Sequence, residues 1–303
     1  QTGTIESMEK SFQEAHPEWN ITWTTETQGE DTAKDAILND VTTAADVYFF
    51  ANDQLPALAD AGAIAKLGGT TEEMVKTTMS DAVVDTVTYN DGEDGTDVAA
   101  GCDWNNETGL AVTNYLIDLL NNPKVAFADT APAVDELAGE HKIGAWFDGS
   151  WNYDLYKGVL GDDLGVAVIP TYKLNGEDVQ LKGFYGSKCI GVNPQSANPE
   201  VAVAFAAYLG SEEMQLQRYQ ETAQVPTNSA LADTDEIKAD EVASVIIKEA
   251  DVASVAQPVS TAFANNFWTN VSGFATEIST GDFNHDNAQE KLDTFVGTMV
   301  VEE

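Results

Sequence analysis

Aromatic and polar side chains gather around one turn of this sequence. An apolar segment, Ile143–Phe147, runs into an Asp-Gly-Ser turn, and Trp151 and Tyr153 follow directly. A second apolar segment, Gly165–Ile169, ends at Pro170. We expect both segments to be strands. Because ligands of open α/β sheets bind beyond the carboxyl ends of strands, the turn predicts flat aromatic faces at the edge of a ligand cleft.

The elements that must position this turn alternate between strands and helices. Apolar periodicity predicts helices over 4–15, 32–39 and 54–61, and strands over 19–24 and 45–50. Further helices are expected over 199–209, 211–222, 241–249, 267–279 and 287–301. A β-α-β-α order is typical of a doubly wound α/β sheet with helices on its faces.

Charge excludes several classes of partner. The 303 residues include 51 acidic and 14 basic ones, for a net charge of −37. A phosphate backbone needs a basic surface, so we expect no binding to nucleic acid, and an anionic membrane surface is disfavoured in the same way. The simplest interpretation of the charge is a strongly solvated surface.

Motifs for catalysis or for metal binding are not found in the sequence. The three histidines are scattered without partners at ligand spacing, and Cys102 and Cys189 lack a CxxC spacing. Those two cysteines fit one disulfide or two buried thiols equally well. Carboxylates are so abundant that any pair could be proposed as a glycosidase dyad, which makes such a pair uninformative. We therefore expect no cofactor and no metal, and a protein that is not an enzyme.

Four segments, in order along most of the chain, carry a resemblance to a known family. These are Ala45–Asp53 with Leu58–Gly62, Ile143–Trp151 with Gly165–Pro170, Gly191–Pro194 with Ala202–Leu209, and Phe267-Trp268 before a helix ending at Gly281. Together they resemble the extracellular solute-binding proteins of ATP-driven sugar importers, especially the maltose and maltodextrin binders. The resemblance implies an α/β, two-lobed periplasmic-binding-protein-like fold of type II, in which each lobe is a sheet flanked by helices and a hinge joins the lobes.

The resemblance also implies which residues meet the sugar. An aromatic plate binds the apolar face of a sugar ring, and amides or carboxylates bind its hydroxyl rim. By resemblance, Phe50, Trp151 and Trp268 would stack on the sugar and Asp53 would bond its rim. Further candidates come from their place in the sequence: Tyr153 for stacking, Asp148 and Asn152 beside the same turn for the rim, and Tyr185 near an expected hinge. The alternative for the aromatics is a place in the core, and Asp53 could equally cap the following helix. Gln54 stands where maltose binders often carry arginine, which leaves the sugar specificity open.

Lobe boundaries follow from the same resemblance. The first lobe is expected at 1–90 with 194–250, and the second at 91–193 with 251–303. Relative to the family, a first strand and a segment near Asn90 and Asp91 are expected to be missing from the chain. The chain is also expected to begin after a removed targeting sequence.

The function implied is transport of an oligosaccharide. A maltooligosaccharide, an α-glucan, would bind between the lobes of a monomer and be delivered to the transmembrane subunits of an ABC permease. The location would be the extracellular face of the membrane, with a lipid anchor in a Gram-positive cell, or otherwise the periplasm. The alternatives are a different oligosaccharide, a carbohydrate-active enzyme, or a surface sensor or adhesion module.

Overall fold

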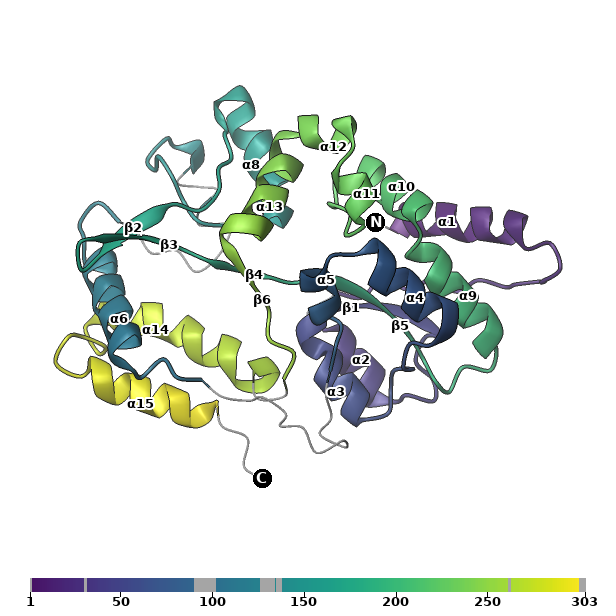
Figure 1. Ribbon diagram of the computed structural model, residues 1–303, viewed down its shortest axis with the longest axis horizontal. Helices are drawn as coiled ribbons and strands as arrows, with labels where there is room; N and C mark the ends of the chain where they lie inside the picture. Colours follow the sequence, from purple (N-terminus) through teal and green to yellow (C-terminus); the bar gives the residue numbers. More distant parts are fainter. Residues whose placement is uncertain are drawn as a thin grey trace. The chain divides into compact units, whose positions relative to one another are not determined.

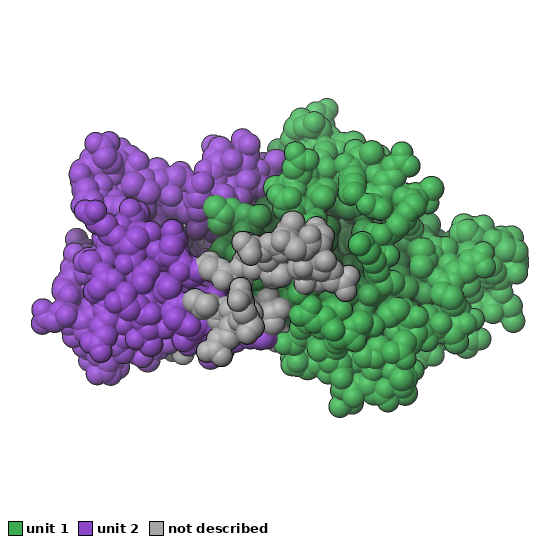
Figure 2. Space-filling view, turned by 60° about the horizontal axis from the view of Figure 1, so that its bottom comes forward, with its two compact units in different colours: residues 1–98, 184–243, 255–261 green, residues 99–183, 244–254, 262–303 purple. Residues whose placement is uncertain are grey.

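The computed structural model describes residues 2–29, 32–89, 102–125, 134, 138–260 and 263–299 (Figure 1). The chain divides into two compact units, coloured separately in Figure 2. Unit 1 comprises residues 1–98, 184–243 and 255–261, and unit 2 comprises residues 99–183, 244–254 and 262–303. The chain therefore passes between the units several times. The predicted break near Asn90 and Asp91 lies outside the described residues.

The centre of unit 1 is an antiparallel strand pair with apolar side chains on both faces. Strand β1 (Val47–Ala51) pairs with β5 (Lys188–Val192) so that Tyr48 lies opposite Gly191. Because successive side chains of a strand point to opposite faces, the pair contributes to two separate cores. One contains Tyr48 and Phe50 with residues of α2 (Ala33–Asn39) and α3 (Leu55–Asp60).

The opposite face of β1 and β5 packs against the second core of unit 1. This core joins Met8 and Phe12 of α1 (Thr2–Ala15), Phe205 of α9 (Pro199–Leu209) and Met214 of α10 (Glu212–Thr222). Pro199 opens α9, and the Ser211 side chain caps α10 by accepting a bond from the Met214 amide. The other helices here are α4 (Gly69–Thr78), α5 (Asp81–Asp85), α11 (Ser229–Ala232) and α12 (Asp235–Ala239).

Unit 2 is built mainly on packed helices. Its cores are formed by α6 (Glu107–Leu120), α14 (Trp268–Thr280), α15 (Ala288–Thr298) and a π-helical turn, Phe263–Phe267. Helix α8 (Tyr153–Leu160) follows a 3₁₀ turn, Ser150–Asn152. Strands β2 (Thr171–Leu174) and β3 (Glu177–Gln180) form a hairpin whose turn residues, Asn175 and Gly176, both have positive φ.

Two chain crossings between the units occur within paired strands. Strand β4 (Gly183–Tyr185) pairs with β6 (Ser254–Ala256), and each contains a boundary between the units. The Gly183 amide donates to the Ala253 carbonyl, and the Gln257 amide donates to the Tyr185 carbonyl, both at 2.9 Å. Helix α13 (Glu241–Val252) also contains a boundary.

Three predicted strands are wrong. Residues 19–24, 143–147 and 165–169 have no strand assignment, and the β1–β5 and β2–β3 pairs are antiparallel. Apolar alternation marks a segment that is half buried, whereas a strand also requires a neighbour that offers backbone donors and acceptors. Trp19 and Trp23 pack on the α1 side of unit 1 without such pairing.

Candidate functional site

The turn at residues 148–152 is organised by one carboxylate. Oδ1 of Asp148 accepts hydrogen bonds from the Gly149 amide at 2.7 Å and from Nδ2 of Asn152 at 2.8 Å. Its other oxygen accepts a bond from the hydroxyl of Tyr156, whose buried ring packs edge-on against Trp146 at 4.9 Å. Asp148 and Asn152, predicted to bond a ligand, thus bond each other and tie the turn to α8.

The aromatic side chain carried by this turn is exposed. Trp151 is 78% exposed, the largest value among the exposed large apolar side chains described. Tyr153, the first residue of α8, is half-buried. A tryptophan displayed on a fixed turn offers a flat apolar face to a ligand, and polar groups stand beside it.

A second set of aromatics in unit 2 surrounds Phe267. Trp268 is 46% exposed and meets Phe263 and Phe267 edge-on at 5.7 and 5.1 Å. Trp104 is 39% exposed, stacks on Phe295 at 5.3 Å and meets Phe267 edge-on. Trp104 was not among the predicted aromatics, although the sequence places it two residues before Asn106, a good N-cap for the apolar segment that forms α6.

The predicted residues of unit 1 lie near the end of β1 and on β4. Phe50 is only 2% exposed and packs in the core with its ring 6.0 Å from that of Tyr48. A ring enclosed on both sides has no face for a sugar, so the structure places Phe50 in the core, the alternative considered above. Asp53 is half-buried in a 3₁₀ turn, Asn52–Gln54, after β1. Burial raises the pKa of Tyr185 above its ordinary value, and its hydroxyl is a protonated donor at neutral pH with or without that shift.

Two polar residues beside Asp53 have structural partners. Asn52 is 1% exposed and accepts the Ser187 amide at 3.1 Å, while its Nδ2 has no hydrogen-bond partner in this structure. Gln54 accepts the Lys34 amide at 2.9 Å, so its oxygen is used to hold the start of α2. At this position, where maltose binders often carry arginine, the chain has Gln54, which hydrogen-bonds the backbone of α2.

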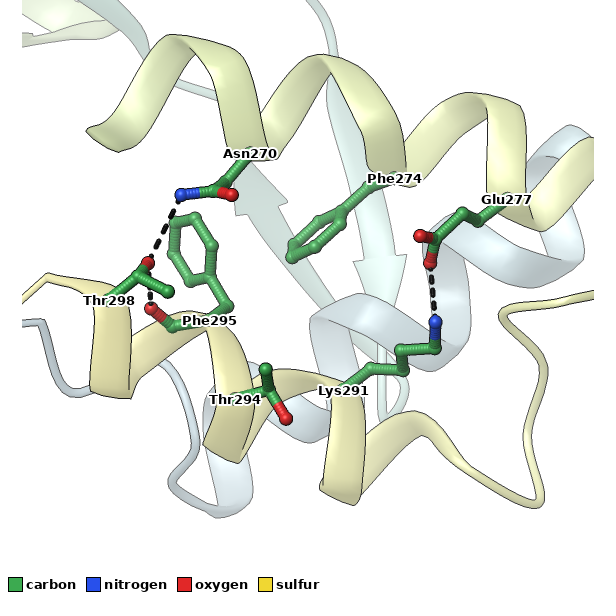
Figure 3. A pocket seen from close by; sticks show the side chains of 7 residues that line it. All are labelled: Asn270, Phe274, Glu277, Lys291, Thr294, Phe295 and Thr298. Atoms are coloured by element: carbon green, nitrogen blue, oxygen red, sulfur yellow. Dashed lines mark hydrogen bonds and ion pairs between the residues drawn. The ribbon is translucent and has the colours of Figure 1, made fainter. Parts of the chain in front are cut away.

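A small pocket of ≈ 150 Å³ lies between α14 and α15 (Figure 3). Polar groups at its rim pair with one another: Nζ of Lys291 with Glu277 at 2.7 Å, and Nδ2 of Asn270 with Thr298 at 3.2 Å. Phe274 and Phe295 form its apolar part. Because these polar groups bond one another across the two helices, few donors are left for a ligand.

Three negative findings concern the described part of the chain. No group of three or more histidine, cysteine or acidic side chains there could hold a metal ion. None of the helices described is long and apolar enough to span a membrane. No disulfide joins Cys102 and Cys189.

Comparison with known proteins relates this chain to a family. A model of the bacterial extracellular solute-binding protein family matches residues 73–244. A galactooligosaccharide-binding protein of Bacillus subtilis (strain 168) is 26% identical over 148 residues, which span 49% of this chain and 34% of that relative.

Solved structures match nearly the whole chain. One, in complex with acarbose, is 35% identical with a TM-score of 0.87 and covers 98% of this chain and 94% of its own. The maltodextrin-binding protein MalE1 from L. casei BL23 is 24% identical with a TM-score of 0.87, over 99% and 96%. A cyclo/maltodextrin-binding protein complexed with maltotetraose is 17% identical with a TM-score of 0.78, over 98% and 93%. The two-lobed α/β fold is therefore confirmed, and because the family model matches more than half of the chain, this protein belongs to the bacterial extracellular solute-binding proteins.

Proposed function

We propose that this protein binds an oligosaccharide, in first place a maltooligosaccharide, and delivers it to an ABC permease without chemical change. The observation that carries the proposal is the exposed indole of Trp151 on a turn held by Asp148. The solved structure in complex with acarbose, 35% identical to this chain, supports an α-glucan ligand. Trp268 and Tyr185 are proposed as further contacts, one for stacking and one for a hydroxyl bond.

A different oligosaccharide is the second candidate. The relative from Bacillus subtilis is named for binding galactooligosaccharides, and it supports a ligand of that kind. Gln54, which is engaged with the α2 backbone, also weakens the match to the maltose binders at that position. The extracellular, lipid-anchored location and the monomeric state belong to the same proposal.

A thermal-unfolding screen distinguishes the two candidates. The ligands are maltose, maltotriose, longer maltodextrins, galactooligosaccharides and pentose oligosaccharides. A ligand present at about 1,000 times its Kd stabilises the folded state by about 4 kcal/mol, which raises Tm by several degrees. A rise confined to α-glucans supports the first candidate, and a rise confined to galactooligosaccharides supports the second.

Two further measurements test what a shift in Tm leaves open. When the protein is incubated with the sugar that it binds, chromatography should recover the sugar intact. Sustained cleavage of the sugar would show that the protein is an enzyme. The predicted lobes (1–90 with 194–250, and 91–193 with 251–303) and their closure on the ligand stay predictions. Small-angle scattering should show a smaller radius of gyration with sugar than without it.

A further inference from the structure

Gly149 has an ordinary backbone conformation but no room for a side chain. Its φ of −88° and ψ of 153° are extended values that any residue adopts. A Cβ at this position would lie 2.2 Å from Cη2 and 2.3 Å from both Cζ2 and Cζ3 of Trp151. Carbon atoms in contact lie about 3.5–4.0 Å apart. A side chain at position 149 would therefore meet the indole and not the backbone, and the ring could not keep its present place.

The same three distances orient the ring. A point almost equally far from three consecutive atoms of a six-membered ring lies close to the axis through the ring centre. The missing Cβ would thus point into the face of the indole rather than at its edge. One face of Trp151 lies on the Gly149 backbone, which leaves the opposite face as the exposed one in a side chain that is 78% exposed.

Asp148 keeps the backbone under the ring in place. It accepts the Gly149 amide at 2.7 Å and Nδ2 of Asn152 at 2.8 Å, one residue on each side of the segment that carries Trp151. The bond from the Tyr156 hydroxyl joins this arrangement to α8. An added side chain at position 149 therefore cannot be accommodated by a free shift of the turn, and the indole must move.

We propose that Gly149 is a positioning residue for the ligand. Because it has no side chain, the Trp151 ring lies flat on the turn, presents a single face, and loses little conformational freedom when the ligand binds. This inference deepens the proposed function and rests on it for the ligand itself. Preorganised aromatic groups improve affinity because the cost of immobilising them is met before the ligand arrives.

The first test needs no ligand. Fluorotryptophan is incorporated in place of the six tryptophans, and the ¹⁹F resonance of Trp151 is assigned as the one lost in Trp151→Phe. Gly149→Ala should shift that resonance. Gly144→Ala is the matched control, since nothing lies within 4 Å of a Cβ built there on the preceding segment. A Trp151 resonance unchanged in Gly149→Ala would overturn the inference, whatever the protein binds.

The second test uses affinity for the oligosaccharide found in the thermal screen. Gly149→Ala should weaken binding about tenfold or more, and Gly144→Ala should leave it unchanged. In the double variant Gly149→Ala with Trp151→Ala, the glycine substitution should add no further loss, because its effect acts through the ring. Equal and additive losses would contradict the proposal.

A folding defect is separated from misplacement of the ring by the same variants. If Gly149→Ala lowers Tm, removing the indole makes room for the Cβ, and the double variant should unfold at the temperature of Trp151→Ala. A double variant that unfolds well below it would show that Gly149 serves the backbone instead. Wild-type protein that binds no oligosaccharide would refute the proposed function, while the ¹⁹F result would still decide the placement of the ring.

Discussion

At the scale of single residues, the candidate site depends on how polar groups are shared. Asp148 was expected to bond a ligand, and the structure shows its two oxygens accepting three donors of its own turn and helix. A carboxylate used in this way controls the position of its neighbours. Its contribution to binding would then be indirect, through Trp151.

The most direct prediction concerns Trp151. Trp151→Ala should weaken oligosaccharide binding by about 2–4 kcal/mol, because a central aromatic anchor carries a large share of the binding energy. Titration calorimetry measures the loss. Val203→Ala, which removes an exposed apolar side chain of α9 in unit 1, is the control and should bind as the wild type does. Unchanged affinity in Trp151→Ala would remove this residue from the site.

Asp148 should matter for stability as well as for affinity. In Asp148→Ala the amide of Gly149 and the side chains of Asn152 and Tyr156 lose an acceptor, and we expect a loss of about 1–3 kcal/mol. Thermal unfolding checks this. Asp154→Ala removes a carboxylate from the first turn of α8, where it interacts with the helix dipole, and should cost only about 0.3–1 kcal/mol. Equal effects of the two substitutions would contradict the role assigned to Asp148.

At the scale of the elements, glycine decides whether β1 and β5 can pack. Gly191 lies opposite Tyr48, and a Cβ there would be 2.5 Å from the Tyr48 ring. The tyrosine cannot easily move away, because its hydroxyl donates to the Ala63 carbonyl at 2.7 Å. The strand pair thus needs a residue without a side chain at this register position.

Gly191→Ala should therefore destabilise unit 1 by about 1–3 kcal/mol through overpacking. Denaturant unfolding gives the value. Gly297→Ala in α15 is the contrast, since nothing lies within 4 Å of its Cβ and alanine favours a helix over glycine by about 0.5–1 kcal/mol. A stabilising Gly191→Ala would mean that Tyr48 has room to shift after all.

At the scale of the whole molecule, charge repulsion works against folding. A net charge of −37 on 303 residues repels itself in the compact state more than in the unfolded chain. The ion pairs described involve mostly exposed side chains, and such pairs contribute little. Each unit must therefore be stabilised mainly by its own apolar cores.

Salt should stabilise the protein. Raising the ionic strength from about 10 mM to about 150 mM shortens the screening length from about 30 Å to about 8 Å, so repulsion between distant carboxylates weakens. We expect Tm at neutral pH to rise over this range of sodium chloride. The rise should become smaller at a pH close to 4.1, the isoelectric point calculated from the sequence, where the net charge vanishes. A Tm that falls with salt at neutral pH would show that attractive pairs dominate.

The elements in contact with the cores were largely predictable. The helices at the start and end of the chain carry their apolar residues at helical spacing, and α1, α9, α10, α13, α14 and α15 lie close to their predicted ranges. Their caps are local as well, as at Ser211. Periodicity and capping depend on neighbours within a few residues, which the sequence contains in full.

Pairing and exposure were decided by the tertiary structure. The segments 19–24, 143–147 and 165–169 have strand-like composition but no strand assignment, because pairing depends on what lies beside them. Phe50 and Trp151 were equivalent as aromatic residues near the ends of apolar segments, yet one is 2% exposed and the other 78%. By itself the sequence determined the family, the helices and the turn that carries Trp151. Only the packing of distant segments decided which ring is enclosed and which is displayed, since burial depends on contacts that a linear pattern does not contain.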